Sequence, residues 1–165
     1  MIDEKKNYLM LDIDGVISVE PDFYTKRRLP APYGDCYPFN KKCIKILNEI
    51  IEETDCEIVL TSDWRLFLNL KEANDVFKLN NVIKSPIGYT KSLYDIFADS
   101  RNLAQIRVME ISDFIVKNNI KHFAVVDDLV MLPSPFEERF IHCGRIREGI
   151  KQSGLKEKII KTLKK

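Results

Sequence analysis

Three short apolar runs, each followed by acidic or hydroxyl side chains, alternate along the chain with amphipathic segments. The runs cover residues 7–11, 56–61 and 122–126. Each run is too short for a typical helix and long enough for a buried strand. Apolar residues at helical spacing predict helices over 41–53, 64–79 and 102–118. This alternation is typical of a parallel sheet with helices on both faces.

The remaining segments complete a small α/β chain. Residues 81–84 and 139–142 are predicted short strands, and residues 149–163 a closing helix. Residues 18–40 hold four of the seven prolines and have no helical period, so we expect an irregular flap there. The 165 residues suffice for one domain over residues 1–165, with about five strands.

An acid pair follows the first run. Strand alternation places the carboxylates of Asp12 and Asp14 on one face, and Gly15 then allows the backbone to turn sharply. Two like charges held together are costly unless a cation neutralises them. Hard oxygen ligands favour Mg²⁺, so the pattern predicts a magnesium site and, with it, a nucleophilic carboxylate.

The other two runs end in groups of the same kind. Thr61 ends the second run and Ser62 follows it, and Asp127 and Asp128 follow the third. Ligands of open α/β sheets bind beyond the carboxyl ends of the strands, where these groups are expected to meet. The coincidence of three polar strand ends predicts one metal-dependent site.

The order of these motifs resembles the haloacid dehalogenase (HAD) superfamily of phosphatases. More narrowly, the segments LDIDGV, LTSDWR, RVMEISDFI and AVVDD resemble the small HAD domain of Swiss army knife RNA-repair proteins. The resemblance extends over about residues 7–163, and Val108 departs from it where that family usually has glycine. It implies a three-layer α/β/α Rossmann-like sheet with a small flap and no large cap domain.

The resemblance also implies roles for the four aspartates. Asp12 would be the nucleophile that forms an aspartyl-phosphate. Asp14 would protonate the leaving oxygen and later activate water. Mg²⁺ would bind the Asp12 carboxylate, the Asp14 backbone carbonyl, and Asp127 or Asp128.

The phosphoryl group needs its own hydrogen-bond donors and a cation. Thr61 is the first choice for a hydroxyl donor and Ser62 the second. Arg107 is the first choice for the cation, because we expect it at the start of the 102–118 helix, where the helix dipole favours anions. Arg65 is the second cation candidate. Weaker candidates are Lys84, Lys91 and Arg101.

Two neighbours of the second strand end have open interpretations. Trp64, the only tryptophan, either packs against the first turn of the following helix or stacks on a ring of the substrate. Asp63 is expected to cap that helix.

Charge and composition limit the partners. A net charge of +1 argues against nucleic-acid affinity over the whole surface, although residues 145–165 hold eight basic and two acidic side chains. That segment is either a solvated helix face or a surface that steers an anionic substrate. The four cysteines form no C-x-x-C pair, and no apolar stretch is long enough for a membrane span, so we expect a cytoplasmic protein.

The predicted function is a Mg²⁺-dependent phosphatase that hydrolyses phosphomonoesters, with nucleic-acid ends as the favoured substrate. The Thr-Ser and Asp-Asp elements also resemble 5′(3′)-deoxyribonucleotidases, so free nucleotides are the alternative substrate. A non-catalytic binding module on the same fold is a further alternative, and transfer of the phosphoryl group to an acceptor other than water shares the same nucleophile. Oligomeric state is not predicted.

Overall fold

A computed structural model describes residues 2–20, 27–94 and 102–165, whose strands form one parallel sheet. Its strands are β1 (Asn7–Leu11), β2 (Glu57–Leu60), β3 (Gly88–Tyr89), β4 (His122–Asp127) and β5 (Phe140–His142). They lie in the order β3-β2-β1-β4-β5. All four strand pairings are parallel, with Leu11 opposite both Leu60 and Val126.

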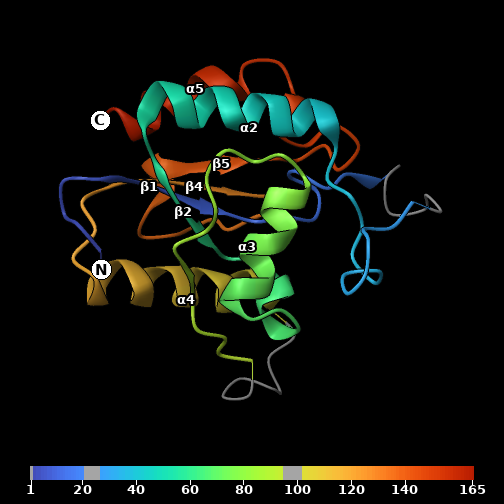
Figure 1. Cartoon of the computed structure of the whole chain (residues 1–165). Helices are drawn as coiled ribbons and strands as arrows, with labels where there is room; N and C mark the ends of the chain where they lie inside the picture. Colours follow the sequence, from blue (N-terminus) through green and yellow to red (C-terminus); the bar gives the residue numbers. More distant parts are fainter. Residues whose placement is uncertain (1, 21–26, 95–101) are drawn as a thin grey trace.

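Helices cover both faces of this sheet (Figure 1). Helices α2 (Lys41–Thr54) and α5 (Leu155–Leu163) lie on one face, and α4 (Leu103–Lys117) lies on the other. Helix α3 (Leu70–Leu79) adds Val76 and Phe77 to the core that α2 and α5 cover. The predicted three-layer α/β/α fold is therefore confirmed.

The alternation of β1 divides its side chains between two cores. Leu9 and Leu11 lie in the core beneath α2 and α5, whereas Tyr8 and Met10 lie in the core that also contains Ile111 of α4. Side chains two residues apart share a face, so Asp12 continues the row of Tyr8 and Met10. The sequence of β1 thus directs its following carboxylate towards α4.

Two predicted helices are each interrupted. The 64–79 segment divides into a 3-10 turn, η1 (Asp63–Leu66), and α3, because Asn69 starts a new helix in a capping box with Glu72. The 149–163 segment divides into η3 (Gly149–Lys151) and α5, which begins after Gly154 at a φ of +83°.

The predicted strand at residues 81–84 is wrong. Helix α3 ends at Leu79, Asn81 has a φ of +60°, and the chain pairs with β2 only later, at β3. The strand predicted at 139–142 is β5, preceded by the 3-10 turn η2 (Glu137–Arg139).

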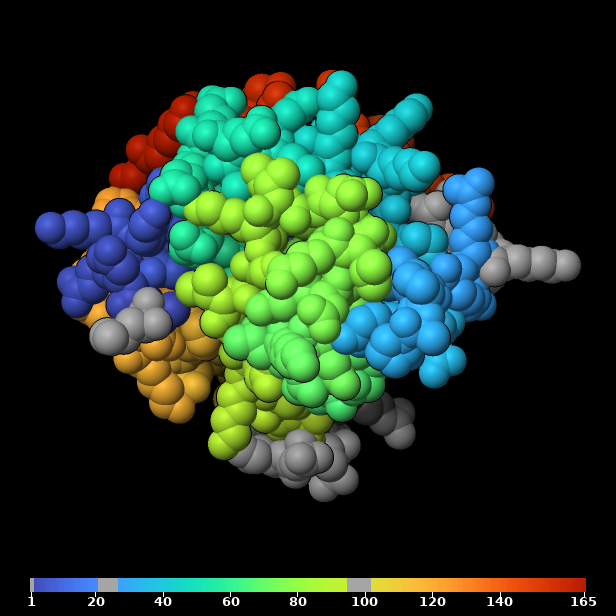
Figure 2. All heavy atoms as spheres, in the orientation of Figure 1, coloured from blue at the N-terminus to red at the C-terminus, as the bar shows by residue number. Residues whose placement is uncertain are grey.

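The second half of the predicted flap packs on α3. The Phe39 ring lies 5.7 Å from the Trp64 ring and 5.3 Å from the Phe77 ring, measured between centroids. The Tyr33 hydroxyl donates a hydrogen bond of 2.8 Å to Asp75 of α3. Figure 2 shows this segment, in light blue, against the green atoms of α3. Residues 21–26 of the predicted flap lie outside the described residues.

None of the helices in the described ranges has both the length and the apolar character needed to cross a membrane.

Candidate active site

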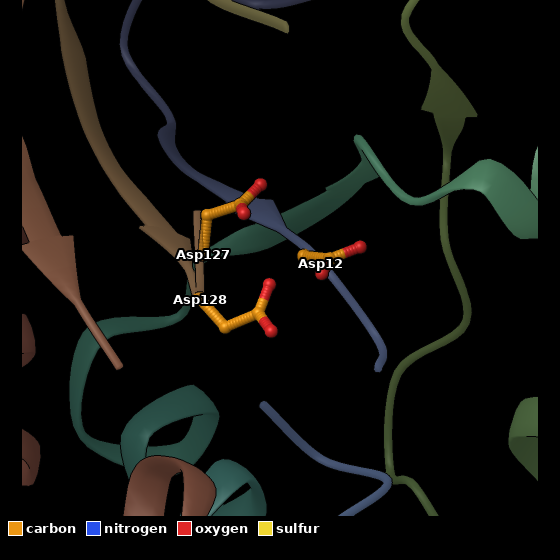
Figure 3. A group of neighbouring side chains, drawn as sticks. All are labelled: Asp12, Asp127 and Asp128. Atoms are coloured by element: carbon orange, nitrogen blue, oxygen red, sulfur yellow. The ribbon is translucent and has the colours of Figure 1, made fainter. Parts of the chain in front are cut away.

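Three carboxylates meet where β1 and β4 end. The two strands are neighbours, and the Asp12 N–H extends their pairing with a 3.1 Å bond to the Val126 carbonyl. One carboxylate oxygen each from Asp12, Asp127 and Asp128 lies within 4.8 Å of the other two. Figure 3 shows the three side chains gathered at these strand ends. Three hard oxygen donors at this spacing fit a divalent cation such as Mg²⁺.

Gly15 makes room for one of these carboxylates. Its φ is +73°, and a Cβ atom at this position would collide with the Asp128 carboxylate. The Gly15 N–H donates a 2.7 Å hydrogen bond to the Ser18 carbonyl, which closes the turn after β1. Glycine is therefore required both by the backbone conformation and by the approach of Asp128.

Arg107 links the acid cluster to the β2 end. Its guanidinium lies 3.0 Å from Asp127 Oδ2, 3.5 Å from Asp12 Oδ1 and 2.9 Å from Asp63 Oδ1. Helix α4 begins at Leu103 after an Asn102 cap, so Arg107 lies in the second turn rather than at the helix start. The prediction that Arg107 lies at the helix start, where the dipole favours anions, is therefore wrong. Arg107 reaches the site through its long side chain.

Burial raises the pKa of every carboxyl in the cluster. It raises the pKa of Asp12, although the Arg107 charge and hydrogen bonds from the Ile13 N–H and the Ser62 hydroxyl oppose the rise. Burial and the nearby Asp12 charge raise the pKa of Asp127 well above its usual value and that of Asp128 to about 6. Burial lowers the pKa of Arg107, but the surrounding carboxylates outweigh it and raise that pKa overall. The site therefore holds more buried acidic groups than cations to balance them.

Asp14 stands apart from this cluster and has a different partner. The Trp64 indole N–H donates a 2.9 Å hydrogen bond to Asp14 Oδ2. Burial raises the pKa of Asp14 to about 6, the indole bond opposes the rise, and the Asp12 charge adds to it. Trp64 is buried against Phe39 and Phe67, so the packing interpretation is the one that fits.

At the end of β2 the two hydroxyl candidates differ in position. Ser62 lines the pocket beside Asp12 and also caps η1 by accepting from the Trp64 N–H. Thr61 is fully buried, and its hydroxyl has no hydrogen-bond partner among the described residues. The cap predicted for Asp63 is wrong, because Ser62 holds that position and the half-exposed Asp63 binds Arg107 instead.

Arg65, the second cation candidate, lies behind the site. Its guanidinium donates to the Thr61 carbonyl and, at 2.8 Å, to the Ser62 carbonyl. It also pairs with Glu110 at 2.5 Å, with both side chains almost fully buried. Arg65 therefore fixes the backbone at the end of β2 rather than lining the pocket.

The groups surround a small pocket of about 150 Å³. Its lining residues are Asp12, Asp14, Ser62, Asp63, Tyr94, Leu103, Arg107, Asp128 and Leu129. Two of the weaker cation candidates, Lys84 and Lys91, do not line the pocket. Lys84 pairs with Asp55 and Glu57 instead, and Lys91 is exposed. Arg101 lies outside the described residues.

Sequence reasoning missed the part that Glu110 plays. This buried carboxylate accepts from Arg65, lies 3.7 Å from the Arg107 guanidinium, and accepts a 2.8 Å bond from the Leu93 N–H. The signal was present, because Glu110 follows Arg107 by three residues and so shares its helix face. The position of Tyr94 was not predicted either: it lines the pocket, and its hydroxyl lies 3.4 Å from Asp63 Oδ2.

Comparison with known proteins agrees with this arrangement. No curated protein and no solved structure shows significant similarity to the chain. Residues 8–154, however, match the family described as the HAD domain in Swiss Army Knife RNA repair proteins. That match includes all of the residues placed in the site and, apart from Asn7, all five strands. It indicates hydrolase chemistry of the phosphatase type. The chain therefore belongs to the family of HAD domains found in Swiss Army Knife RNA repair proteins.

Proposed function

We propose that the protein is a Mg²⁺-dependent phosphatase that removes a terminal phosphate from nucleic-acid ends through an aspartyl-phosphate. The observation that carries the proposal is the meeting of three carboxylates and the Arg107 guanidinium at one pocket. Carboxylates alone would repel a phosphate, and a lone arginine would bind it without reacting. The combination supports phosphoryl transfer.

The first step forms the covalent intermediate. An oxygen of the Asp12 carboxylate attacks phosphorus while the bond from phosphorus to the ester oxygen breaks. The leaving oxygen takes the proton of the Asp14 carboxyl group. Arg107 and the Ser62 hydroxyl bind the non-bridging oxygens and stabilise charge during the transfer. Ser62 is preferred to Thr61 here because it lines the pocket.

The second step returns the enzyme to its starting state. The Asp14 carboxylate now accepts a proton from water, and the resulting hydroxide attacks phosphorus. The bond from phosphorus to the Asp12 oxygen breaks, inorganic phosphate leaves, and Asp14 is again protonated. Both proton transfers use one carboxyl group, which requires Asp14 to lie outside the ligand cluster of Asp12, Asp127 and Asp128.

The same cluster fits the metal that the family typically uses. Asp12, Asp127 and Asp128 would hold Mg²⁺, as would the Asp14 backbone carbonyl. When bound, Mg²⁺ supplies positive charge that offsets the repulsion between the nucleophile and the phosphate.

The size of the pocket supports a terminal phosphate on a larger molecule. A volume of about 150 Å³ accommodates a phosphoryl group and little more, so most of the substrate would lie outside. The family is found in RNA repair proteins, which favours a strand end over a free metabolite.

The test is hydrolysis of p-nitrophenyl phosphate by wild type, Asp12→Asn and the control Asp113→Asn, which alters a carboxylate on α4 outside the pocket lining. We expect EDTA to abolish turnover, Mg²⁺ to restore it, and Asp12→Asn to lower kcat by at least about 10⁴-fold. Turnover by Asp12→Asn at the rate of Asp113→Asn would overturn the mechanism.

Substrate class is tested in the same assay. We expect oligonucleotides with a 3′- or 5′-phosphate to be hydrolysed with higher kcat/KM than the matching nucleoside monophosphates. Preference for the monophosphates would replace this substrate with free nucleotides. If no phosphomonoester turns over and beryllium trifluoride fails to bind, the chain is a binding module rather than an enzyme.

A further inference from the structure

We propose that Trp64 is a positioning residue, which holds the Asp14 carboxyl group so that one defined oxygen delivers the proton to the leaving group. The inference rests on the proposed function, since it concerns the acid of that reaction. It assigns a role to a buried side chain that does not line the pocket.

The chemistry of the indole makes the contact directional. Its N–H is a donor only, so it always presents a hydrogen to the carboxyl group. Because Asp14 Oδ2 accepts this bond at 2.9 Å, the transferable proton of the acid form belongs on Oδ1. Trp64 thus selects both the side-chain rotamer of Asp14 and the oxygen that acts.

The indole is itself held from two sides. The Phe39 ring lies 5.7 Å away and the Phe67 ring 5.6 Å away, both tilted relative to the indole. The main chain fixes it as well, since the Trp64 N–H is bound by the Ser62 cap of η1. Trp64 is only 5% exposed, so its indole cannot rotate without losing this packing.

This packing connects the segment between β1 and α2 to the acid. Phe39 belongs to that segment and contacts both Trp64 and Phe77 of α3. Residues 27–40 of this segment therefore act on the chemistry through Phe39, Trp64 and Asp14 in turn, although none of these fourteen residues lines the pocket.

The kinetic test compares two leaving groups. p-Nitrophenolate departs without a proton, whereas the alkoxide of a 3′-phosphorylated oligonucleotide needs one. In Trp64→Phe, which keeps an aromatic ring but removes the N–H, we expect kcat/KM for the oligonucleotide to fall about 10- to 100-fold. For p-nitrophenyl phosphate we expect a change of less than about threefold.

The matched control is Leu66→Ala, which alters an exposed side chain of the same 3-10 turn and leaves the indole and its two aromatic neighbours in place. We expect it to change the ratio of the two kcat/KM values by less than about twofold. Equal losses on both substrates in Trp64→Phe would overturn the inference, because they would show a structural role. An unchanged ratio with full activity would overturn it as well.

A second measurement is independent of activity. Trp64 is the only tryptophan, so the protein has one indole N–H resonance in a ¹H–¹⁵N spectrum. We expect Asp14→Ala to move it upfield and Asp113→Ala to leave it in place. An unmoved resonance in Asp14→Ala would overturn the contact on which the inference depends.

The two failures are distinguishable. Loss of the Asp14-dependent shift, or of the leaving-group effect in an active enzyme, refutes the role of Trp64 alone. A wild type that hydrolyses neither substrate refutes the proposed function and, with it, the catalytic role of Trp64.

Discussion

Two charge clusters lie at opposite edges of the same sheet and differ in balance. At the amino edge, Lys6 and Lys84 each lie 2.6 Å from the Asp55 carboxylate, and Lys84 is also 3.2 Å from Glu57. Two cations thus meet two anions, and the Lys6 and Asp55 side chains are largely exposed. Their pairing lowers the pKa of Asp55 to about 2.

The carboxyl edge has the opposite character. Among the described residues, Arg107 is the one cation that lines the pocket, together with four carboxylates, and Asp127 behind the pocket adds a fifth. Burial and mutual repulsion raise the pKa of Asp14, Asp127 and Asp128 rather than lower it. An exposed and balanced cluster needs nothing further, whereas a buried and unbalanced one requires a cation. The difference distinguishes a structural ion-pair group from a ligand site.

The largest effect is expected from removing the Arg107 guanidinium, the one cation that the described residues place in the pocket lining. In Arg107→Met the phosphate loses its guanidinium partner, so we expect kcat/KM to fall about 10³-fold. Arg107→Lys keeps the charge but loses the bidentate geometry, so it should retain an intermediate rate. The measurement is steady-state hydrolysis of a phosphomonoester with saturating Mg²⁺.

Lys117→Met is the control for this variant. It removes the same charge from the other end of α4, where Lys117 pairs with the exposed Asp113. We expect its kcat/KM to stay within about twofold of wild type. An Arg107→Met enzyme as active as this control would exclude Arg107 from phosphate binding.

The next effect concerns the buried pair behind the pocket. Glu110→Gln removes the buried counter-charge of the Arg65 guanidinium, which keeps only the half-exposed Asp63 at 3.6 Å. We therefore expect a loss of about 3 kcal/mol in the free energy of unfolding. Urea titration followed by fluorescence of the single tryptophan gives the value.

Glu49→Gln provides the matched comparison. It breaks an ion pair of similar length, 2.7 Å to Lys156, that is partly open to solvent. We expect only a small change in the urea midpoint. Equal losses from the two variants would show that burial is not what distinguishes these pairs.

A smaller effect is expected on the pH dependence of the free energy of unfolding. The folded-state pKa of Asp14 and Asp128 is about 6, against a usual value of 3.8, so the folded protein holds more protons between these values. In the absence of metal, rising pH therefore lowers the free energy of unfolding over this range. Mg²⁺ opposes the loss by binding the ionised carboxylates.

We accordingly expect about 5 mM Mg²⁺, an excess over the protein, to raise Tm more at about pH 7.5 than at about pH 5. Differential scanning fluorimetry of wild type and Asp127→Asn provides the measurement. The variant should lose most of the Mg²⁺ response. A shift equal at both pH values, or equal in Asp127→Asn, would contradict a metal site at this cluster.

The order of elements was predictable because local patterns determine it. The apolar runs and helical periods gave the strands and helices that form the core, and the parallel sheet followed from their alternation. Errors arose where the pattern was weak. Asn69 and Gly154 divide continuous apolar periods, and the two residues of β3 carry no periodic signal.

The site was predictable to the level of strand ends and less so beyond them. The acids at the ends of β1 and β4 meet because neighbouring parallel strands end at one edge. Which of Thr61 and Ser62 faces the pocket depends on the turn into η1, and the burial of Arg65 depends on Glu110 from another element. Contacts between distant elements leave no local signature in one sequence.

The smallest expected effect belongs to the amino edge and tests whether its charges are only structural. Asp55 ends α2 at a φ of +49°, a conformation that asparagine tolerates as well, so Asp55→Asn removes the charge with little change in backbone preference. Since the folded-state pKa of Asp55 is about 2, below its usual 3.8, the pairing stabilises the protein at neutral pH and is lost as pH falls through this range.

We expect Asp55→Asn to lower Tm by no more than about 3 °C at neutral pH, and less in about 1 M salt, because exposed pairs are weak and screened. Catalysis should be unchanged, since the pocket lies at the other edge of the sheet. A Tm loss that persists in high salt, or exceeds that of Glu110→Gln, would mean that charge balance at the amino edge contributes more to stability than its exposure permits.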